Sequence, residues 1–421
     1  MRTRLLFWPC YLIFHPDCVK HVLQGNHQNY DRNLFLYKAP QAFLGKGLAT
    51  TDGPSWLHEA AIQQPAFHRT RIAAFSALMT EVTAAMLVQW QSIAEQGRPL
   101  DIAEEMMRLT LRIIGQALFT VNLSDESDTV GQAFTTVLTL LGSYLYLSFP
   151  PLGVPTPRNQ RMKAGIQALD AVVQRMIVRI RQRQVEREDL LSMLLQDQDE
   201  ETGERMSDQQ VRDEVLTLLF AGHETTANAL TWAWYLLSQH PEVERRLRAE
   251  LDEVLGNQMP SLEHLARLPY THMVTEETLR LYPPGAMLMR RAIAEDVING
   301  YTIPVGSLVF LSPYVTHRHP AYWDEPEVFN PERFRPERAA TRHRYAYFPF
   351  GGAPHLCIGN HFAMMEAQLI LATIAQHYRL PLVAGQHVEP QVVTTISPRG
   401  GLQVTLRRRV RRANRATSSS R

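Results

Sequence analysis

Hydrophobic residues recur at helical spacing along most of this chain. The spacing predicts helices over residues 16–24, 56–68, 100–119, 131–147, 158–185 and 360–378, and the proline at position 241 opens another that runs to about residue 255. Short strands are predicted at residues 11–14, 297–303 and 308–311, with a hairpin near 392–406. Helix dominates and strand is minor, so the predicted fold class is mainly α with a small β region.

The longest helical segment, residues 207–239, is apolar on several sides, as expected for a helix through a protein interior. One of its turns is polar and reads Ala221-Gly222-His223-Glu224-Thr225-Thr226. Hydroxyls and a carboxylate in such a place cost free energy unless something uses them. The turn is therefore either functional or a helix surface that happens to be polar.

Cys357 lies in a glycine-rich loop directly before the predicted helix 360–378. A thiol at a helix N-terminus meets the positive end of the helix dipole, so we expect the thiolate to be favoured. Such a sulfur can act as a nucleophile, a redox group or a soft metal ligand. Neither a general base nor a second cysteine is apparent nearby, which argues against the first two roles. A buried structural cysteine in a tight turn is the remaining alternative.

The run around this cysteine closely resembles the haem-binding signature of the cytochrome P450 family, Phe-x-x-Gly-x-Arg/His-x-Cys-x-Gly. Phe350, His355, Cys357 and Gly359 match it in spacing, and Ala353 stands where the family usually has glycine. The resemblance implies a single haem-binding domain with the P450 fold. It also implies haem b (iron protoporphyrin IX) as cofactor, with Cys357 as the axial ligand.

Three further patterns of the family occur in the expected order. The polar turn 221–226 matches the segment that crosses above the haem. Glu277-x-x-Arg280 and the segment 331–334, Pro-Glu-Arg-Phe, match two motifs whose side chains form a buried triad. Residues three apart on a helix share a face, so Glu277 and Arg280 can pair. The resemblance adds Arg333 to them in a structural role.

The resemblance also assigns contacts to the haem propionates. Trp56, Arg290 and His355 match family positions that donate to them. Four residues after the tryptophan the family usually has an arginine, whereas this chain has Ala60. His58, within one helical turn, is the candidate substitute, although the neighbouring Glu59 works against an anion.

The implied activity is that of a haem-thiolate monooxygenase, which inserts one oxygen atom of dioxygen into a C–H bond. Glu224 and Thr225 correspond to the pair that passes protons toward dioxygen, and Cys357 favours O–O cleavage. Electrons are expected from a ferredoxin or flavodoxin with its NAD(P)H reductase, because 421 residues leave no room for a fused flavin reductase. Two alternatives stay open: a peroxide-driven or isomerising haem-thiolate enzyme, and a decayed relative that binds haem poorly.

The substrate is expected to be an apolar small molecule such as a fatty acid, terpenoid, steroid or polyketide. Residues 142–149 resemble the mobile roof over the site. Positions that match the substrate-lining segments of the family are Leu219, Phe220, Ala221, Ala286, Met287, Thr395 and Ile396. Core residues of any buried helix would look alike, so these positions do not choose a substrate.

Composition limits the domain number, the class of binding partner and the cellular compartment that we expect. The chain has 421 residues, no linker and 45% hydrophobic residues, which favours one domain with a sizeable core. A net charge of +1 argues against a nucleic-acid binder. Three cysteines cannot form a disulfide framework, and the apolar residues 5–14 are too few to span a bilayer. We therefore expect a cytoplasmic protein without a membrane anchor.

The two ends depart from the family pattern. The resemblance starts abruptly near Tyr11, so we expect a core, residues 1–406, without the usual N-terminal helix and strand and with an unpaired edge strand. Residues 407–421 carry seven arginines and are expected to form a disordered basic tail.

Overall fold

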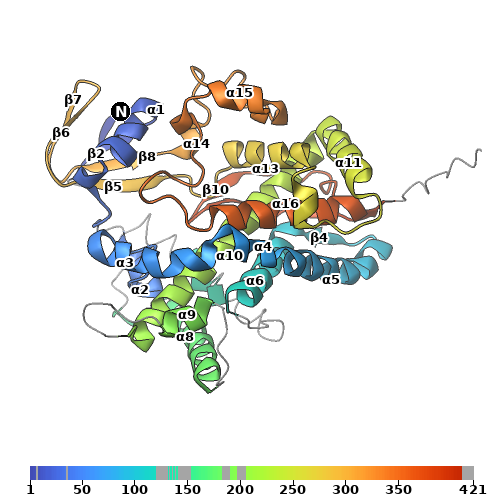
Figure 1. The fold of residues 1–421 in the computed structure, drawn as a ribbon, viewed down its shortest axis with the longest axis horizontal. Helices are drawn as coiled ribbons and strands as arrows, with labels where there is room; N and C mark the ends of the chain where they lie inside the picture. The colour runs from blue at the N-terminus through green and yellow to red at the C-terminus, as the bar shows by residue number, and fades with distance from the viewer. Residues whose placement is uncertain are drawn as a thin grey trace, which may run out of the picture.

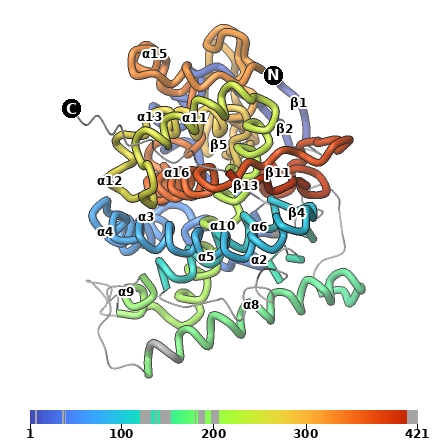
Figure 2. The backbone as a smooth tube through the Cα atoms, turned by 90° about the vertical axis from the view of Figure 1, so that its right-hand side faces the viewer, coloured from blue at the N-terminus to red at the C-terminus, as the bar shows by residue number. Residues whose placement is uncertain are grey.

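Helices form most of the protein, and the larger β region lies at one side (Figure 1). The structure, a computed structural model, describes residues 1–5, 8–34, 37–119, 153–182, 190–196 and 205–409, and residues 131, 133, 134, 136, 137, 139 and 140. The helices are α1 (Pro16–Lys20), α2 (Lys38–Leu44), α3 (Gly53–Gln63), α4 (Arg69–Ala74), α5 (Ser76–Glu95), α6 (Ile102–Phe119), α8 (Pro157–Gln182), α9 (Leu190–Gln196), α10 (Asp208–Gln239), α11 (Pro241–Leu255), α12 (Leu262–Leu265), α13 (Pro269–Leu281), α14 (Pro313–Thr316), α15 (Pro336–Thr341) and α16 (Asn360–His377). Figure 2 shows α8 along the edge of the molecule opposite α15.

Helix α10 runs through the interior, as its sequence predicts. Its N-terminus is closed by a capping box in which the Ser207 hydroxyl and the Gln210 side chain satisfy each other's backbone N–H groups. Its C-terminus precedes Pro241, which cannot continue the hydrogen-bonding ladder and instead begins α11. Helices α6, α8, α13 and α16 all pack against α10, so it is buried along most of its length.

The predicted helices 56–68 and 158–185 are α3 and α8, with ends shifted by a few residues. Helix α3 stops at Gln63 and continues as a 3-10 turn, Gln64–Phe67, where Pro65 supplies no N–H. The predicted helix 16–24 divides into α1 and one π-helical turn, His21–Gly25. Of the predicted helix 131–147, the described residues between 131 and 140 are helical, and the remainder lies outside the described residues.

A five-stranded sheet forms the β region, in the order β1-β2-β8-β5-β3. Its strands are β1 (Arg2–Leu5), β2 (Trp8–Ile13), β8 (Leu308–Leu311), β5 (Leu288–Ala292) and β3 (Tyr30–Asp31). The predicted strand 11–14 is β2, and the prediction that it is an unpaired edge was wrong. β1 folds back on it as an antiparallel partner, from Arg2 opposite Tyr11 to Leu5 opposite Trp8, while β8 pairs with its other side.

Three small pairings correct the other strand predictions. Residues 297–303 form not one strand but a hairpin of β6 (Asp296–Ile298) and β7 (Tyr301–Ile303), which turns at Asn299 and Gly300, both with positive φ. In the predicted hairpin 392–406, β10 (Pro390–Val392) pairs with β11 (Ile396–Pro398). The chain then turns at two glycines, and β12 (Gln403–Thr405) pairs instead with β4 (Pro99–Asp101), far away in sequence.

The basic tail begins later than predicted. Arg407 and Arg408 form β13, which pairs with β9 (Tyr378–Arg379). The Arg409 guanidinium donates to a carboxylate oxygen of Asp252 at 2.8 Å. The chain is therefore part of the fold through residue 409, and residues 410–421 lie outside the described residues.

A buried ion-pair network joins α13 to the segment after it. Glu277 receives two N–H groups from Arg280, at 2.6 and 2.8 Å, and the Arg333 Nε lies 3.5 Å from it. All three side chains are almost completely buried. The backbone N–H of Asn330 also donates to Glu277, at 2.9 Å. The triad predicted from the two motifs is thus present.

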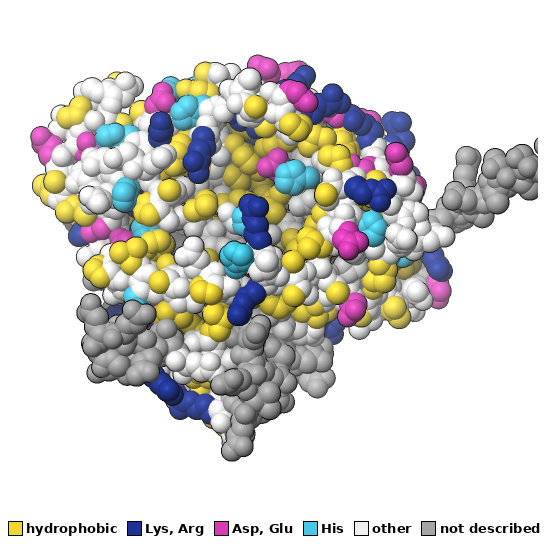
Figure 3. All heavy atoms as spheres, in the orientation of Figure 1, with side chains coloured by type: hydrophobic (Ala, Val, Ile, Leu, Met, Phe, Trp, Pro, Cys, Tyr) yellow, Lys and Arg dark blue, Asp and Glu magenta, His cyan; other side chains and the backbone are white. Residues whose placement is uncertain are grey.

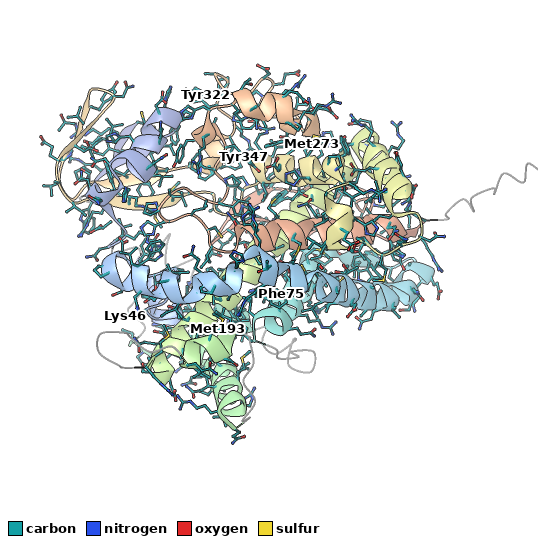
Figure 4. All side chains as sticks on the ribbon, in the orientation of Figure 1. Lys46, Phe75, Met193, Met273, Tyr322 and Tyr347 are labelled. Atoms are coloured by element: carbon teal, nitrogen blue, oxygen red, sulfur yellow. The ribbon has the colours of Figure 1, made fainter. Side chains whose placement is uncertain are left out.

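Tyr347 connects the same helix to the cysteine loop. It lies beside α13 in Figure 4, and its hydroxyl donates to the backbone carbonyl of Glu276 at 3.0 Å. Because Tyr347 precedes Phe350 by three residues, the start of the loop is held against α13. The network therefore fixes the frame on which the loop is built.

One stretch among the described residues, Arg69–Glu95, is long and apolar enough to cross a membrane by those two criteria alone, and 33% of its most apolar window is buried. It comprises α4 and α5, and α5 packs against α16 and α6. Core helices of globular proteins can pass the same test, so this is weak evidence for a membrane span. On the face in Figure 3, basic and acidic side chains are interspersed, as the net charge of +1 leads one to expect.

Candidate active site

The cysteine loop is built by a close backbone fold that leads into α16. The Cys357 N–H donates to the carbonyl of Phe350 at 3.0 Å, and Gly359 is the N-cap of α16. Gly351 has φ +75°, and a Cβ on Gly352 would lie 2.7 Å from the Tyr345 ring, so these two positions require glycine. Ala353 is not among the residues with positive φ. Alanine therefore causes no backbone strain where the family usually has glycine.

Cys357 is exposed in the folded chain, and protein atoms nevertheless crowd its sulfur enough for burial to be the largest influence on its pKa. Burial raises the pKa of the Cys357 thiol, and the N–H of Gly359 opposes this only in part. The expectation that the loop alone favours the thiolate was therefore wrong. A cation at the sulfur would supply what the helix N-terminus does not.

No partner for Cys357 lies within the described part of the chain. Cys10 and Cys18 are also free thiols, and they belong to β2 and α1 in the β region. Among the described residues, no group of three or more His, Cys, Asp or Glu side chains could hold a metal ion.

The polar turn of α10 presents one open stripe on an otherwise buried helix. Ala221 is exposed, and Phe220, Gly222 and Thr225 are half-buried, whereas the flanking turns are buried. A Cβ on Gly222 would meet Ile114 of α6 at 2.7 Å, so the glycine allows the close approach of these two helices. The Thr225 hydroxyl donates to the Ala221 carbonyl at 2.6 Å.

Glu224 does not bond with Thr225. Its Oε1 accepts the hydroxyls of Thr394 and Thr395, each at 2.7 Å, from the turn between β10 and β11. Burial raises the pKa of Glu224, and the two hydroxyls lower it in part. The acid and the threonine are neighbours on the helix but are held by different partners.

A second polar group gathers around Trp56 at the start of α3. The rings of Trp56 and His355 lie 4.1 Å apart, and the Arg32 guanidinium stands 5.7 Å from the indole centroid. Asp52 lies 3.4 Å from His355 Nε2 and accepts the backbone N–H of Arg32 at 2.5 Å. Burial alone would raise the pKa of Asp52, but bonds from His355, Arg32 and Gly53 hold it well below its usual range. Asp52 is therefore ionised.

This cluster has more cationic donors than acceptors. Arg32 is 11% exposed, and its Nε and Nη2 have no hydrogen-bond partner within the described residues, nor has His355 Nδ1. Arg290 is 6% exposed, and its only hydrogen bond within the described residues goes to the backbone carbonyl of Met289. Burial lowers the pKa of both arginines, and the charge of Arg290 adds to the effect at Arg32. Two buried cations with unused N–H groups form a cradle for an anionic group.

The structure brings together three predicted haem contacts. Trp56, His355 and Arg290 share the cluster, and His58 is exposed on α3, where its charge acts on Glu59. Arg32 supplies this cluster with a cation, whereas Ala60 stands at the position of the family arginine. No sequence motif marked Arg32, because it follows β3 and meets Trp56 only in the folded chain.

The predicted substrate-lining residues fall into two groups, one accessible and one buried. Phe220 and Ala221 lie on the open stripe, and Met287 is 46% exposed. Ala286 and Ile396 instead pack with Trp232 in a closed cluster, 9% and 1% exposed. Residues 142–149 lie outside the described residues.

A mainly helical protein with an exposed cysteine in the loop before one helix, and a cluster of cationic donors that includes His355 of the same loop, has the design of a haem-thiolate protein. The comparisons agree: the family model for cytochrome P450 matches residues 1–406. The chain belongs to the cytochrome P450 family, and it is a monooxygenase, an oxidoreductase that uses protoporphyrin IX haem.

Named relatives support this family. The chain is 38% identical to cyclooctatin synthase of Streptomyces melanosporofaciens over 91% of this chain and 83% of the relative. It is 34% identical to pentalenene oxygenase of Streptomyces avermitilis over 92% and 85%. The crystal structure of the cytochrome P450DA heme domain matches with a TM-score of 0.89 and 29% identity, covering 97% of this chain and 90% of that chain.

The residues present fit a haem. The unused N–H groups of Arg32 suit carboxylates such as the two propionates, and the Cys357 thiol suits the iron. Although position 60 is alanine, the cluster still contains a cation, because Arg32 reaches Trp56 from another part of the chain.

Proposed function

We propose that this protein hydroxylates an apolar terpenoid, with Cys357 as the axial ligand of its haem. The open stripe of α10 carries the proposal, because an apolar surface beside Thr225 is what such a substrate requires. The names of three relatives, cyclooctatin synthase, cyclooctat-9-en-7-ol 5-monooxygenase and pentalenene oxygenase, favour terpenoids over the other apolar classes.

In this proposal the chain holds the haem at two places. The Cys357 sulfur binds the iron as thiolate, and the N–H of Gly359 stabilises its charge. Arg32, Trp56, Arg290 and His355 take the propionates. Asp52 lies 3.4 Å from His355 Nε2, and His355 would donate to a propionate from Nδ1 once its imidazole carries a second proton.

Bound haem supplies the activation of dioxygen and the insertion of one oxygen atom into a C–H bond. Phe220 and Ala221 give the substrate an apolar surface that keeps water away from the reacting atom. The Thr225 hydroxyl donates its hydrogen bond to the Ala221 carbonyl, so its oxygen can accept a hydrogen bond from another group. Glu224 holds a proton at Oε2, the oxygen that no donor occupies, and releases it toward the site.

Electrons come from a separate ferredoxin or flavodoxin with its NAD(P)H reductase, in the cytoplasm. The measurement is product formation with such a partner and NAD(P)H, against product formation with hydrogen peroxide alone. Turnover on peroxide without NAD(P)H would replace this part of the proposal with the peroxide-driven alternative.

The carbon monoxide difference spectrum of the reduced protein tests the ligand. We expect the red-shifted Soret band of a thiolate-bound haem, and its loss in Cys357→Ala. Cys18→Ala is the matched control and should keep the band. Spin-state titrations with terpenoids and with fatty acids of similar size then test the substrate class. A red-shifted band in Cys357→Ala would refute the ligand, and a response only to fatty acids would refute the substrate class.

A further inference from the structure

Two threonines outside α10 determine the surroundings of its buried acid. Glu224 is 5% exposed, and both of its hydrogen bonds come from the turn between β10 and β11. Thr394 and Thr395 each donate to Oε1 at 2.7 Å, whereas Oε2 has no partner among the described residues. The two oxygens of the carboxyl group therefore differ. Oε1 accepts two hydrogen bonds, and Oε2 is available to carry a proton.

Asn228 fixes the direction of one of these bonds. Its amide Nδ2 donates to the Thr395 hydroxyl oxygen at 2.7 Å. A hydroxyl has a single proton, so Thr395 accepts from Asn228 and gives its own proton to Glu224. Asn228 lies one helical turn after Glu224, and the chain Asn228–Thr395–Glu224 closes a loop between α10 and the turn.

The turn itself is anchored to the protein core. The backbone N–H of Ile396 donates to the Pro284 carbonyl at 3.2 Å, and the Ile396 carbonyl accepts the Trp232 indole N–H at 3.0 Å. Trp232 also lies on α10, so the turn is attached to this helix at two positions, Glu224 and Trp232. Ile396 and Trp232 share one buried cluster. The threonine hydroxyls are consequently placed by rigid packing.

No charged group competes with these hydroxyls at Glu224. Burial is the main cause that raises its pKa, and the two hydroxyls are the opposing causes; no charge from α10, α6 or the β10–β11 turn is among them. The adjacent His223 is neutral near pH 7, because burial lowers its pKa to about 4. Burial therefore raises the proton affinity of Glu224, and two neutral donors are what oppose it.

We infer that Thr394 and Thr395, with Asn228 behind Thr395, are positioning residues for proton delivery. They hold the Glu224 carboxyl by Oε1 and lower its proton affinity below what burial alone would give. This inference rests on the proposed function for the role of Glu224 as proton donor, but the clamp itself is tested without turnover.

The experiment is an infrared pH titration of the resting ferric protein. The carbonyl band of protonated Glu224 is assigned as the band missing in Glu224→Gln. Thr394→Val and Thr395→Val keep the side-chain shape and remove one hydroxyl each. We expect the midpoint of the band to rise by roughly one pH unit for each hydroxyl removed, and Thr395→Ser to restore the original midpoint.

Thr231→Val is the matched control. Its hydroxyl is buried on the same helix but donates to the Ala227 carbonyl at 2.8 Å, so the Glu224 midpoint should not move. An unchanged midpoint in the Thr394→Val/Thr395→Val double variant would overturn the inference. Thr394 is half-buried, so its single variant serves where the double variant fails to fold. These readouts need neither substrate nor redox partner, so failure of the proposed terpenoid hydroxylation would leave them unaffected.

Discussion

Arg32 offers the most direct test of how this protein retains its cofactor. Its guanidinium is 11% exposed and places two unused N–H groups beside Trp56, His355 and Arg290. Among the described residues, the carboxylates that attract this cation are Asp52, at 3.9 Å, and Glu59. A haem propionate would use both N–H groups. Replacing Arg32 by methionine keeps an unbranched side chain of similar length and removes the charge.

The expected change follows from the strength of such bonds. Hydrogen bonds to charged groups contribute about 1.5–3 kcal/mol each and are not additive, so about 2 kcal/mol is expected for the loss of both. At 1.4 kcal/mol per tenfold change, haem should dissociate roughly 30-fold faster from Arg32→Met. The apoprotein should respond differently. Its free energy of unfolding should fall by no more than about 1 kcal/mol, because the contact with the Trp56 ring and the attraction to Asp52 are lost while the cost of burying an unsatisfied cation is removed.

The assay is transfer of haem to excess apomyoglobin, followed in the Soret band, beside urea unfolding of the apoprotein. His58→Ala is the control, because this exposed residue was the substitute suggested by sequence; its rate should stay within about twofold of wild type. Ala60→Arg in the Arg32→Met background should restore part of the retention. A wild-type dissociation rate in Arg32→Met, or an equal loss in His58→Ala, would show that Arg32 is not an anchor.

Three further outcomes are expected. Glu277→Gln should lower the free energy of unfolding by about 3–5 kcal/mol in urea titrations, because two buried arginines lose their countercharge. The control is Glu104→Gln, in an exposed ion pair, which should change the free energy of unfolding by less than about 1 kcal/mol. Burial raises the pKa of Glu276 to about 7, so the folded state binds the extra proton and stability falls as pH rises from 4.5 to 7. Glu276→Gln should abolish that fall, which is about 3 kcal/mol for a rise of about 2.5 pKa units at 1.36 kcal/mol each, and a wild-type pH profile in the variant would contradict the assignment. Thr225→Ala should lower product formed per NAD(P)H at least tenfold and release peroxide, whereas unchanged coupling would mean that protons arrive by another route.

Local patterns were sufficient for much of the fold and for the cysteine. The 207–239 helix, the helix from Pro241 and the strand 308–311 were predicted within a residue, because continuous periodicity, a capping box and a helix-starting proline are all encoded nearby in the chain. The pairing of Glu277 with Arg280 follows from a spacing of three on one helix. These features depend on neighbours in sequence.

Features that depend on distant segments were missed or misplaced. β1 covers the predicted free edge of β2, and β12 leaves the expected hairpin to pair with β4. Neither choice is visible locally, because a strand pairs with whichever edge the packing of the helices brings to it. The thiol of Cys357 was misjudged for a related reason: its helix N-terminus is visible in sequence, but the burial that raises its pKa is not.

The sequence by itself therefore determined the class of this protein, many of its helices although not α5, its thiol ligand candidate and the polar turn of α10. Only the tertiary structure decided which side chains surround them. Arg32 reaches Trp56 from another element, and Thr394 and Thr395 reach Glu224 across 170 and 171 residues. The physical reason is that a buried charge or carboxyl group must be satisfied by whatever the fold brings within hydrogen-bond distance, and that distance is set by packing rather than by position along the chain.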